Sequence, residues 1–391
     1  MTLSDVCEFI VDCPHSTAKD EGVGHPLIRT PNVGRARLLL EDVHRVSEAV
    51  YRIRNLRATP QDDDLIMARE APAGNVAIVK NGEKVCLGQR TVLLRPDKKK
   101  ACPDYLVYYL LAPQQQYGLL GTANGATVAH VNIPVIKSLP VALPSLEVQK
   151  RIAGILTAYD DLIENNQRQI KLLEEAAQRL YREWFVNLRF PGHETVPVVD
   201  GVPDGWQLTT IGEICVKTKD TIPAESIPAG TPYIGLEHIP RHDFCLSQWG
   251  DAADITSPKA RFKRNDIIFG QIRPYFHKVG FALTDGVAST DSFIMTPRRD
   301  VWALFMLTVF SDAFVNYSYQ TCKEGAKMPR ADWNQMKQYQ VIVADPQTQI
   351  TFEKRILSIT EEVRTLALQN RNLTEARDRL LPKLMSGEIA V

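Results

Sequence analysis

Apolar side chains recur at intervals of three and four residues along two long stretches of the chain, which predicts two long amphipathic helices. The first begins at Ser145, a favourable N-cap residue, and stops at Pro191. The second begins at Asp345, with Pro346 at the first helical position, and Pro382 is expected to kink or end it just before Gly387. At 1.5 Å per residue, some 40 residues make a rod of roughly 60 Å.

Heptad spacing defines an apolar seam on each helix, as in a coiled coil or bundle. The seam positions are Ile152, Ile155, Leu162, Leu173 and Leu180 in the first helix and Ile356, Ile359, Val363 and Leu373 in the second. A neighbouring row at sevens adds Ile163, Ile170, Ala177 and Trp184 to the first seam.

Asn166 and Asn370 interrupt the two seams, and their residue numbers differ by 204. If the helices are antiparallel, the two side chains face each other, and a buried Asn pair fixes register at a cost in stability. Because the pattern does not settle how each helix is rotated, exposure of both side chains to solvent is the alternative.

Outside the helices, short apolar runs with β-branched residues are bounded by Gly, Asn and Pro, which predicts strands; residues 77–79 and 90–94 are examples. One shorter helix is expected near residues 105–111. The chain is thus predicted to be α+β, with two mixed α/β domains joined by the two long helices. The expected divisions are residues 1–143, 144–190, 191–344 and 345–391.

The second half of the chain repeats the first. Asp64-Leu65-Ile66 with Pro72 returns 202 residues later as Asp266-Ile267-Ile268 with Pro274. Further matches, at offsets of 200 to 204, are Val85 with Val287, Val92 with Ile294, Leu93 with Met295, Gly125-Ala126 with Gly325-Ala326, and Arg151-Ile152 with Arg355-Ile356. This slow drift is typical of a duplicated chain with loop insertions, and it predicts an internal pseudo-two-fold with antiparallel coiled-coil helices.

Length and charge narrow the class of protein. A chain of 391 residues is expected to form two to four structural units. Its 46 Lys and Arg balance 46 Asp and Glu, which excludes a strongly basic non-specific binder but permits a basic face. Seven scattered Cys without a CxxC pair, and an N-terminus unlike a signal peptide, favour reduced thiols and a cytoplasmic location. The longest apolar stretch, residues 301–309, is too short to span a membrane.

The sequence contains none of the common catalytic motifs. GxGxxG, GxxxxGK[ST], GxSxG, HExxH and the Asp/Asn-Pro-Pro-aromatic motif of amino-methyltransferases are all missing, so no catalytic residue and no cofactor are expected in this chain. His238 and His242, with Cys245 beyond, faintly suggest a metal site. Because Pro240 breaks the helix that would align the histidines, surface loops are the favoured interpretation, and no metal is predicted.

Basic, polar and aromatic side chains cluster at corresponding places in the two mixed domains. Arg forks onto phosphates or onto the guanine edge, and phosphate contact is the more common outcome. The candidate DNA-binding residues are Arg29, Asn32, Arg35, Arg37, Arg52, Arg54, Arg57, Arg69, Arg261, Lys263, Arg264, Gln271, Arg273, Tyr275, Lys278, Lys323, Lys327 and Arg330. The alternative is an ordinary solvated surface, since Glu41, Asp42 and residues 62–64 add negative charge nearby.

Several of these segments resemble one known family. Residues 143–152, 160–163 and 184–185 are similar to the conserved helical region of the specificity subunit (HsdS) of type I restriction-modification systems, and residues 380–389 resemble its closing signature. Residues 266–270 followed by 273–275 resemble a motif of its target-recognition domains, as does the segment 233–237. One departure is Asp63, where the family usually has Gly before Asp.

The resemblance implies a non-catalytic DNA reader. Each target-recognition domain would read one half of a bipartite DNA site, and the helices would set the gap. Two methyltransferase subunits would dock on the helices, each bringing S-adenosylmethionine and flipping a target adenine. Motor-nuclease subunits would complete a restriction enzyme. The alternatives are a coiled-coil scaffold that does not bind DNA and a stand-alone enzyme.

Overall fold

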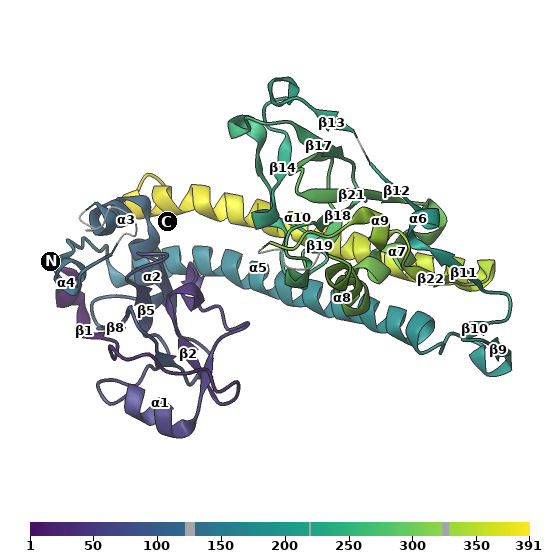
Figure 1. The fold of residues 1–391 in the computed structure, drawn as a ribbon. Helices are drawn as coiled ribbons and strands as arrows, with labels where there is room; N and C mark the ends of the chain where they lie inside the picture. The colour runs from purple at the N-terminus through teal and green to yellow at the C-terminus, as the bar shows by residue number, and fades with distance from the viewer. Residues whose placement is uncertain (122–129, 219, 323–327) are drawn as a thin grey trace. The chain divides into compact units, whose positions relative to one another are not determined.

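The computed structural model describes residues 1–121, 130–218, 220–322 and 328–391. It contains two compact units: unit 1 comprises residues 1–162 and 373–391, and unit 2 comprises residues 163–372. Two long helices, α5 (Leu146–Tyr181) and α10 (Pro346–Ser386), each contribute to both units (Figure 1). The mixture of sheets with two long helices confirms the predicted α+β class.

The long helices begin where the N-cap residues predict. Ser145 Oγ accepts a hydrogen bond from the Val148 N–H, and Asp345 Oδ1 accepts from two N–H groups of the first turn of α10. At the other end, α5 passes into a π-helical turn, η3 (Arg182–Val186), short of the expected stop at Pro191. α10 continues through Pro382 and ends before Gly387, which adopts the left-handed conformation with φ +76°.

The two helices pack antiparallel within each unit. In unit 2, Asn166 Nδ2 donates to Asn370 Oδ1 over 2.9 Å, so the two asparagines face each other as the repeat suggests. Further along the same pair, the ring of Trp184 lies 5.6 Å from that of Phe352. From the asparagine pair to this aromatic pair, the residue number rises by 18 along α5 and its continuation η3, and falls by 18 along α10, so the helices run in opposite directions. In unit 1, the buried carboxylate of Asp160 pairs with Arg377 in the same sense.

The buried stripe of α5 differs from the predicted seam at two positions. Ile155 and Leu162 are 37% and 46% exposed, so their assignment to the seam was wrong for this chain. Leu156 and Ile163 take their places, because the buried stripe follows the neighbouring row that also contains Ala177. The other seam residues, Ile152, Leu173, Leu180, Ile356, Ile359, Val363 and Leu373, are buried or half-buried.

Unit 1 alternates short strands and short helices before α5. Its elements are η1 (Leu3–Val6), β1 (Cys7–Asp12), β2 (His25–Ile28), η2 (Thr30–Asn32), β3 (Ala36–Arg37), β4 (Arg45–Val46), α1 (Glu48–Arg54), β5 (Leu65–Ala68), β6 (Val76–Ile78), β7 (Cys86–Leu87), β8 (Thr91–Pro96), α2 (Pro103–Leu111), α3 (Pro113–Leu120) and α4 (Ile133–Ser138).

Unit 2 has a similar order between the two long helices. Its elements are η4 (His193–Thr195), β9 (Val198–Val199), β10 (Val202–Pro203), β11 (Gln207–Thr210), α6 (Ile211–Ile214), β12 (Cys215–Lys217), β13 (Thr221–Ile222), η5 (Ala224–Ser226), β14 (Pro232–Ile234), η6 (Leu236–His238), β15 (Cys245–Leu246), β16 (Gly250–Asp251), η7 (Ala252–Asp254), β17 (Lys259–Phe262), β18 (Ile267–Gly270), η8 (Pro274–Phe276), β19 (Val279–Ala282), β20 (Gly286–Ala288), β21 (Ser292–Pro297), η9 (Arg299–Val301), α7 (Trp302–Phe310), α8 (Asp312–Gln320), α9 (Trp333–Met336) and β22 (Gln340–Val343).

The sheet topology confirms the internal repeat. Unit 1 has a sheet in the order β1-β8-β5-β6-β3, and unit 2 has the matching order β12-β21-β18-β19-β15. In each sheet the first three pairings are antiparallel and the last is parallel. A second sheet also matches, because β4-β2-β7 has the same strand directions as β16-β14-β20.

The strand register corrects one part of the sequence alignment. Ile66 pairs with Leu93 in unit 1, whereas the equivalent Ile268 pairs with Ile294 rather than Met295. The true offset between β8 and β21 is therefore one residue smaller than the offset that the sequence comparison predicted. A slip of one residue would point every side chain to the opposite face of the sheet, so burial fixes this register. Pro96 and Pro297, at the ends of these strands, show the corrected match.

The same turn precedes the central strand of each sheet. Asp64 Oδ2 accepts from the Gln61 N–H at 2.9 Å, and Asp266 Oδ2 accepts from the Lys263 N–H at 2.8 Å. The residue before each aspartate is left-handed, with φ +74° at Asp63 and +72° at Asn265. Asp and Asn tolerate this conformation without glycine, so the departure at Asp63 leaves the turn unchanged.

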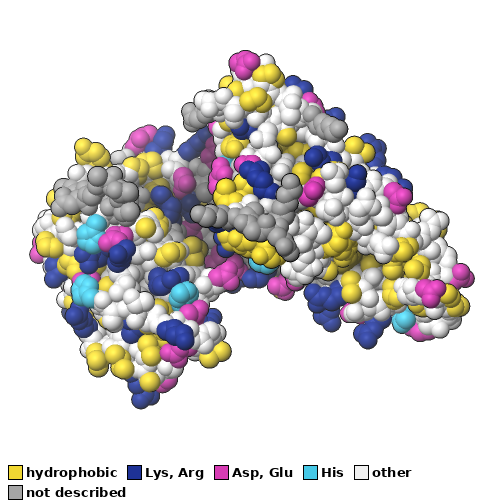
Figure 2. All heavy atoms as spheres, viewed as in Figure 1, with side chains coloured by type: hydrophobic (Ala, Val, Ile, Leu, Met, Phe, Trp, Pro, Cys, Tyr) yellow, Lys and Arg dark blue, Asp and Glu magenta, His cyan; other side chains and the backbone are white. Residues whose placement is uncertain are grey.

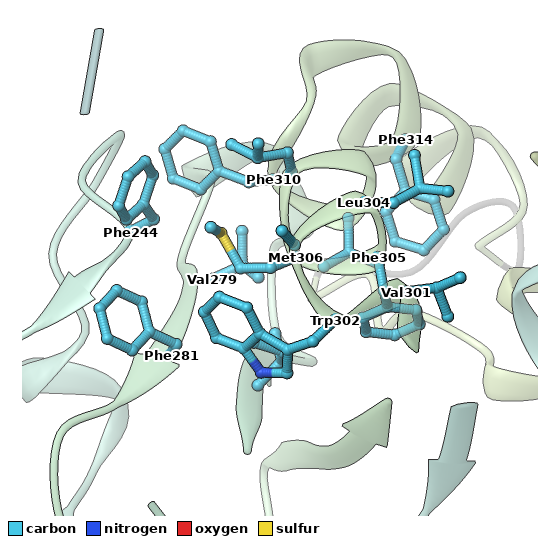
Figure 3. Close-up of a cluster of buried hydrophobic side chains, with 14 of the residues drawn as sticks. Phe244, Val279, Phe281, Val301, Trp302, Leu304, Phe305, Met306, Phe310 and Phe314 are labelled. Carbon is cyan, nitrogen blue, oxygen red and sulfur yellow. The ribbon is translucent and has the colours of Figure 1, made fainter. Parts of the chain in front are cut away.

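The core of unit 2 lies between its first sheet and helix α7. Figure 3 shows Trp302, Met306 and Phe310 of α7 directed toward Phe244 and the strand that carries Phe281. The ring of Trp302 lies 5.7 Å from that of Phe281. Within the described ranges, no single helix is long and apolar enough to cross a membrane; one bent pair, Arg299–Phe310 with Asp312–Gln320, meets that test by length and composition.

Candidate nucleic-acid interface

Part of the arginine-rich stretch of unit 1 reaches solvent. Arg35, Arg52 and Arg57 are exposed. Arg52 belongs to the short helix α1 and pairs with Glu48 at 2.8 Å, and Arg57 lies just beyond the helix. Leu56 between them is 82% exposed. Helix α1 and the residues that follow it thus combine guanidinium groups with an apolar side chain, which suits contact with phosphates and base edges.

Three of the unit 1 candidates have structural roles instead, which corrects their assignment. Arg54 is buried and donates to the carbonyl groups of Leu87, Ser16 and Pro14, which satisfies its guanidinium inside the domain. Asn32 is also buried, accepting from the Arg29 N–H and donating to the Leu39 carbonyl. Buried polar groups with complete hydrogen bonding are not available to a ligand.

Arg69 is the third corrected residue. It pairs with Asp12 at 3.1 Å and donates to the Val131 carbonyl at 3.0 Å. Its side chain is only 11% exposed, so it holds the domain together. Arg29 is half-buried, and half-buried Arg37 is held against α5 by Asp161 at 2.7 Å.

The candidates of unit 2 are more accessible. Lys263 is exposed. Arg261, Arg264 and Arg330 are about half-exposed, and each has an acidic neighbour: Asp220 at 3.6 Å, Glu361 at 2.9 Å and Asp291 at 2.8 Å, respectively. Exposed ion pairs of this kind contribute little to stability, so the guanidinium groups can exchange partners. Lys323 and Lys327 lie outside the described residues, as do Gly125 and Gly325.

The turn after β18 brings the remaining candidates together. Gln271 Nε2 donates to the Thr290 carbonyl at 3.1 Å, and the Arg273 N–H donates to the Pro329 carbonyl at 2.8 Å. Tyr275 is 44% exposed, with its ring edge-on to Tyr319. Lys278 Nζ donates to the Leu236 carbonyl, and burial lowers the pKa of this amine. The turn therefore presents the Tyr275 phenol, whereas Arg273 is half-buried with its guanidinium 5.8 Å from the centre of the Phe276 ring, and Lys278 faces the protein.

A pocket of ≈ 880 Å³ lies beside Arg330. Its functional groups are contributed by Lys217, Phe293, Arg330, Trp333 and Lys337. Lys217 Nζ lies 4.7 Å from the centre of the Phe293 ring. Cationic and aromatic groups on one concave surface can bind a phosphate and stack on a base. Sequence reasoning identified only Arg330 among these five residues; it missed Lys217, Phe293, Trp333 and Lys337, because their segments carry no recognisable motif.

The two long helices anchor the mixed domains by a repeated contact that the sequence analysis also missed. Gln149 Oε1 accepts from the Cys102 N–H at 2.8 Å, at the start of α2. Glu353, which is 204 residues later, accepts from the Ala303 and Leu304 N–H groups at the start of α7. A residue near the start of each long helix thus caps a helix of the mixed domain, α2 in unit 1 and α7 in unit 2. Matching polar residues inside otherwise apolar helix stripes could have revealed this contact.

The suspected set His238, His242 and Cys245 does not form one site. His238 Nδ1 accepts from the Gly235 N–H, and Cys245 is buried in β15, where burial raises the pKa of the thiol. Among the described residues, a different group places metal-ligating atoms close together: His242 with His277 and Asp312.

Charges of both signs share the surface. Figure 2 shows Lys and Arg side chains interspersed with Asp and Glu on the face drawn, rather than gathered in one continuous basic patch. This distribution agrees with the balanced composition. Binding to DNA would therefore depend on individual side chains in each unit rather than on total charge.

Comparison with known proteins relates this architecture to one family. Residues 1–175 match the family described as "Type I restriction modification DNA specificity domain". The chain is 24% identical over 368 residues to the type I restriction enzyme MjaIX specificity subunit of Methanocaldococcus jannaschii, covering 88% of this chain and 82% of the relative. It is 21% identical over 397 residues to the HindI specificity subunit of Haemophilus influenzae, covering 83% and 86% respectively.

A solved structure supports the fold. The S subunit of a type I restriction-modification system from M. genitalium superposes with a TM-score of 0.57 at 15% identity, covering 98% of this chain and 95% of that one. Residues 1–175 thus match this family's domain, and along most of its length the chain is similar to the specificity subunits of type I restriction-modification systems.

Proposed function

We propose that this chain reads a bipartite DNA site, with unit 1 contacting one half-site and unit 2 the other. The observation that carries the proposal is that matching sheets present different surfaces. Between β4 and β5, unit 1 has helix α1, which carries Arg52. Between the corresponding strands β16 and β18, unit 2 has strand β17, which carries Arg261. Two units with the same sheet topology but different basic surfaces are suited to reading two different half-sites.

Within each unit, exposed cations would contact the DNA backbone, and aromatic or forked groups would read bases. In unit 2, Lys217, Arg330 and Lys337 are suited to phosphates because they line one concave surface with Trp333. Arg273 and Tyr275, on the turn after β18, are suited to base edges. In unit 1, Arg35, Arg52 and Arg57 are the corresponding candidates.

The chain would act as the non-catalytic member of an adenine-N6 methyltransferase complex. We assign S-adenosylmethionine and the chemistry to two methyltransferase subunits, which would dock on α5 and α10, with motor-nuclease subunits completing a restriction enzyme. Ile155 and Leu162 on α5, and Leu357 and Ile350 on α10, are exposed apolar residues that a docked subunit would cover.

Binding to duplex DNA tests the proposal. The chain, co-expressed with its methyltransferase subunit, should bind duplex with an affinity that falls steeply as salt rises. Arg330→Ala and Lys217→Ala should each weaken binding by about three- to tenfold and flatten the salt dependence by about one phosphate contact. Arg298→Ala is the matched control: Arg298 is similarly exposed, pairs with Asp300 and lies outside the candidate surface.

Methylation of genomic DNA supplies the second readout. Adenine methylation that depends on this gene should fall within a split motif with a fixed gap, and Arg330→Ala should relax only one half of it. The absence of salt-dependent binding would instead favour a coiled-coil scaffold, and a continuous palindromic motif would contradict the assignment of one half-site to each unit.

A further inference from the structure

Three segments of unit 2 bring potential metal ligands together beside the turn that carries Arg273 and Tyr275. His242 lies in the loop before β15, His277 directly follows η8, and Asp312 opens α8. One ligand atom from each residue lies within 4.8 Å of the other two. We propose that His242, His277 and Asp312 bind a zinc ion.

The hydrogen bonds of His277 determine which of its nitrogen atoms is available. Nε2 lies 2.6 Å from the Phe310 carbonyl oxygen. Because a carbonyl oxygen only accepts, Nε2 carries the proton and Nδ1 is left to bind a cation. Histidine ligands usually have this arrangement, in which the second nitrogen donates to a carbonyl or carboxylate and fixes the ring orientation.

The contact between His277 and Asp312 requires a positive charge between the two side chains. Nδ1 of His277 lies 3.3 Å from Asp312 Oδ1. In the neutral ring these atoms are both acceptors, so either a proton or a metal ion must lie between them. His277 is only 4% exposed, and burial disfavours an imidazolium there. A metal ion would satisfy Nδ1 and the carboxylate together.

The backbone presents the second histidine to the same point. The His242 N–H donates to the His277 carbonyl at 3.3 Å, and the two imidazole rings lie 4.5 Å apart. Both residues have left-handed backbone conformations, with φ +61° and +52°. Such conformations are uncommon for residues other than glycine, although histidine adopts them more readily than most, and strained backbone of this kind clusters at functional sites.

The ligand set favours zinc over harder cations. Two imidazoles and one carboxylate suit Zn²⁺, which would take a water molecule as the fourth ligand. Ca²⁺ and Mg²⁺ prefer oxygen ligands and would be poorly served by two nitrogen atoms. Arg241, which precedes His242, is directed elsewhere, because its guanidinium lies 4.1 Å from the centre of the Phe276 ring.

The metal would add a further link among three segments, of which η8 and α8 already pack together through the rings of Tyr275 and Tyr319. One of them is η8, which contains Tyr275 and is preceded by Arg273. A bound ion would hold this turn on the N-terminus of α8. Zinc binding itself does not depend on the proposed DNA reading, so the two proposals can fail separately.

Titration of the full-length chain with zinc, in competition with a chromogenic chelator, tests the site. The parent chain should bind one equivalent, and Co²⁺ should give the visible spectrum of a tetrahedral nitrogen–oxygen site. His242→Gln and Asp312→Asn should each weaken zinc binding by at least about tenfold. Both residues are exposed, so these variants should remain folded.

His193→Gln is the matched control, because His193 is a partly exposed histidine of the same unit, remote in sequence from the ligands. Its zinc affinity should equal that of the parent chain. Zinc should also raise the Tm of the parent and of the control, but not of His242→Gln. The proposal would be overturned if the parent chain bound no stoichiometric zinc. It would also be overturned if both ligand variants kept the zinc affinity of the parent, which would mean that other residues, such as the cysteines, bind the ion.

Discussion

Asn166 Nδ2 donates a 2.9 Å hydrogen bond to Asn370 Oδ1, which joins α5 to α10 at equivalent positions of the internal repeat. Asn370 Nδ2 in turn donates to the Ile163 carbonyl at 3.2 Å. Asn166 is only 3% exposed, so the donor of this polar pair is buried between the helices. A polar pair fixes one register, because a shifted register would leave buried amide groups without partners.

Replacing both asparagines with leucine should therefore raise thermal stability. Apolar side chains remove the desolvation cost of the amides, and the Tm of Asn166→Leu/Asn370→Leu should exceed that of the parent. Each single variant leaves one buried amide without its partner and should lose about 1–3 kcal/mol. Differential scanning calorimetry of all four chains gives the coupling energy. If the double variant is less stable than the parent, the asparagine pair stabilises the fold, and the idea that it fixes the helix register at a cost in stability is wrong.

The contact between Gln149 and the start of α2 predicts a local effect on unit 1. Gln149→Ala removes the acceptor for the Cys102 N–H and should cost about 1–3 kcal/mol. Amide hydrogen exchange should then accelerate in α2 and leave α7 unchanged. Glu353→Gln is the matched control in unit 2, since the repeat itself uses Gln at the equivalent position. Equal acceleration in both helices would mean that Gln149 does not act as a local cap.

Buried Glu174 predicts a dependence of stability on pH. Burial raises its pKa from 4.5 to about 8, and Asp243 adds to the rise, although the carboxylate accepts from the Cys245 N–H. Between these two pH values the folded chain binds more protons than the unfolded chain. The free energy of unfolding contributed by Glu174 is therefore greatest below pH 4.5 and falls as the pH rises towards 8.

Glu174→Gln should remove this dependence. At pH 5 the variant and parent should be similarly stable, because protonated Glu and Gln have similar shapes. At pH 9 the variant should be more stable by a few kcal/mol, at about 1.4 kcal/mol for each pKa unit. Denaturant unfolding at both pH values measures the difference. Parallel pH profiles for the two chains would show that Glu174 is ionised in the folded protein across this range.

Sequence periodicity predicted the long helices because a stripe of apolar residues has one low-energy arrangement, buried against a neighbour. It failed at Ile155 and Leu162, where two adjacent rows were both apolar and only tertiary packing selects between them. The repeat of Asp64 in Asp266 was recognisable because the same turn requires the same carboxylate. The match of β8 to β21 was predicted one residue out, since a chance similarity between apolar residues at an incorrect offset looks the same as a true one.

Residue type alone was a weaker guide to the candidate site. Arg54 and Arg35 are equivalent by composition, yet one bonds three carbonyl groups inside the domain and the other is exposed. Lys217 and Trp333 line one pocket although more than a hundred residues separate them. His277 meets His242 only because η8 and the preceding loop fold against α8. Long-range packing of this kind has no local sequence signal.

The length of α5 and α10 between their domain contacts should determine the gap in the DNA site. On α5, Asp161 pairs with Arg37 of unit 1 and Glu174 accepts from the Cys245 N–H of unit 2; on α10, Arg364 donates to the Leu283 carbonyl of unit 2. Deleting residues 163–169 together with their antiparallel partners, residues 367–373, removes seven residues from each helix, including buried Ala367 and Arg371, which lies 4.1 Å from the centre of the Trp249 ring of unit 2. Seven residues are two helical turns to within about 20°, so the remaining faces stay nearly aligned. The helices become about 10 Å shorter, equivalent to about three base pairs of DNA. Mapping adenine methylation should show a gap about three base pairs shorter, or no methylation, with each half-site unchanged.

A deletion of four residues from each helix is the control, because it rotates one end against the other by roughly 40° and should be less well tolerated. An unchanged gap with altered half-sites would contradict the assignment of spacing to the helices.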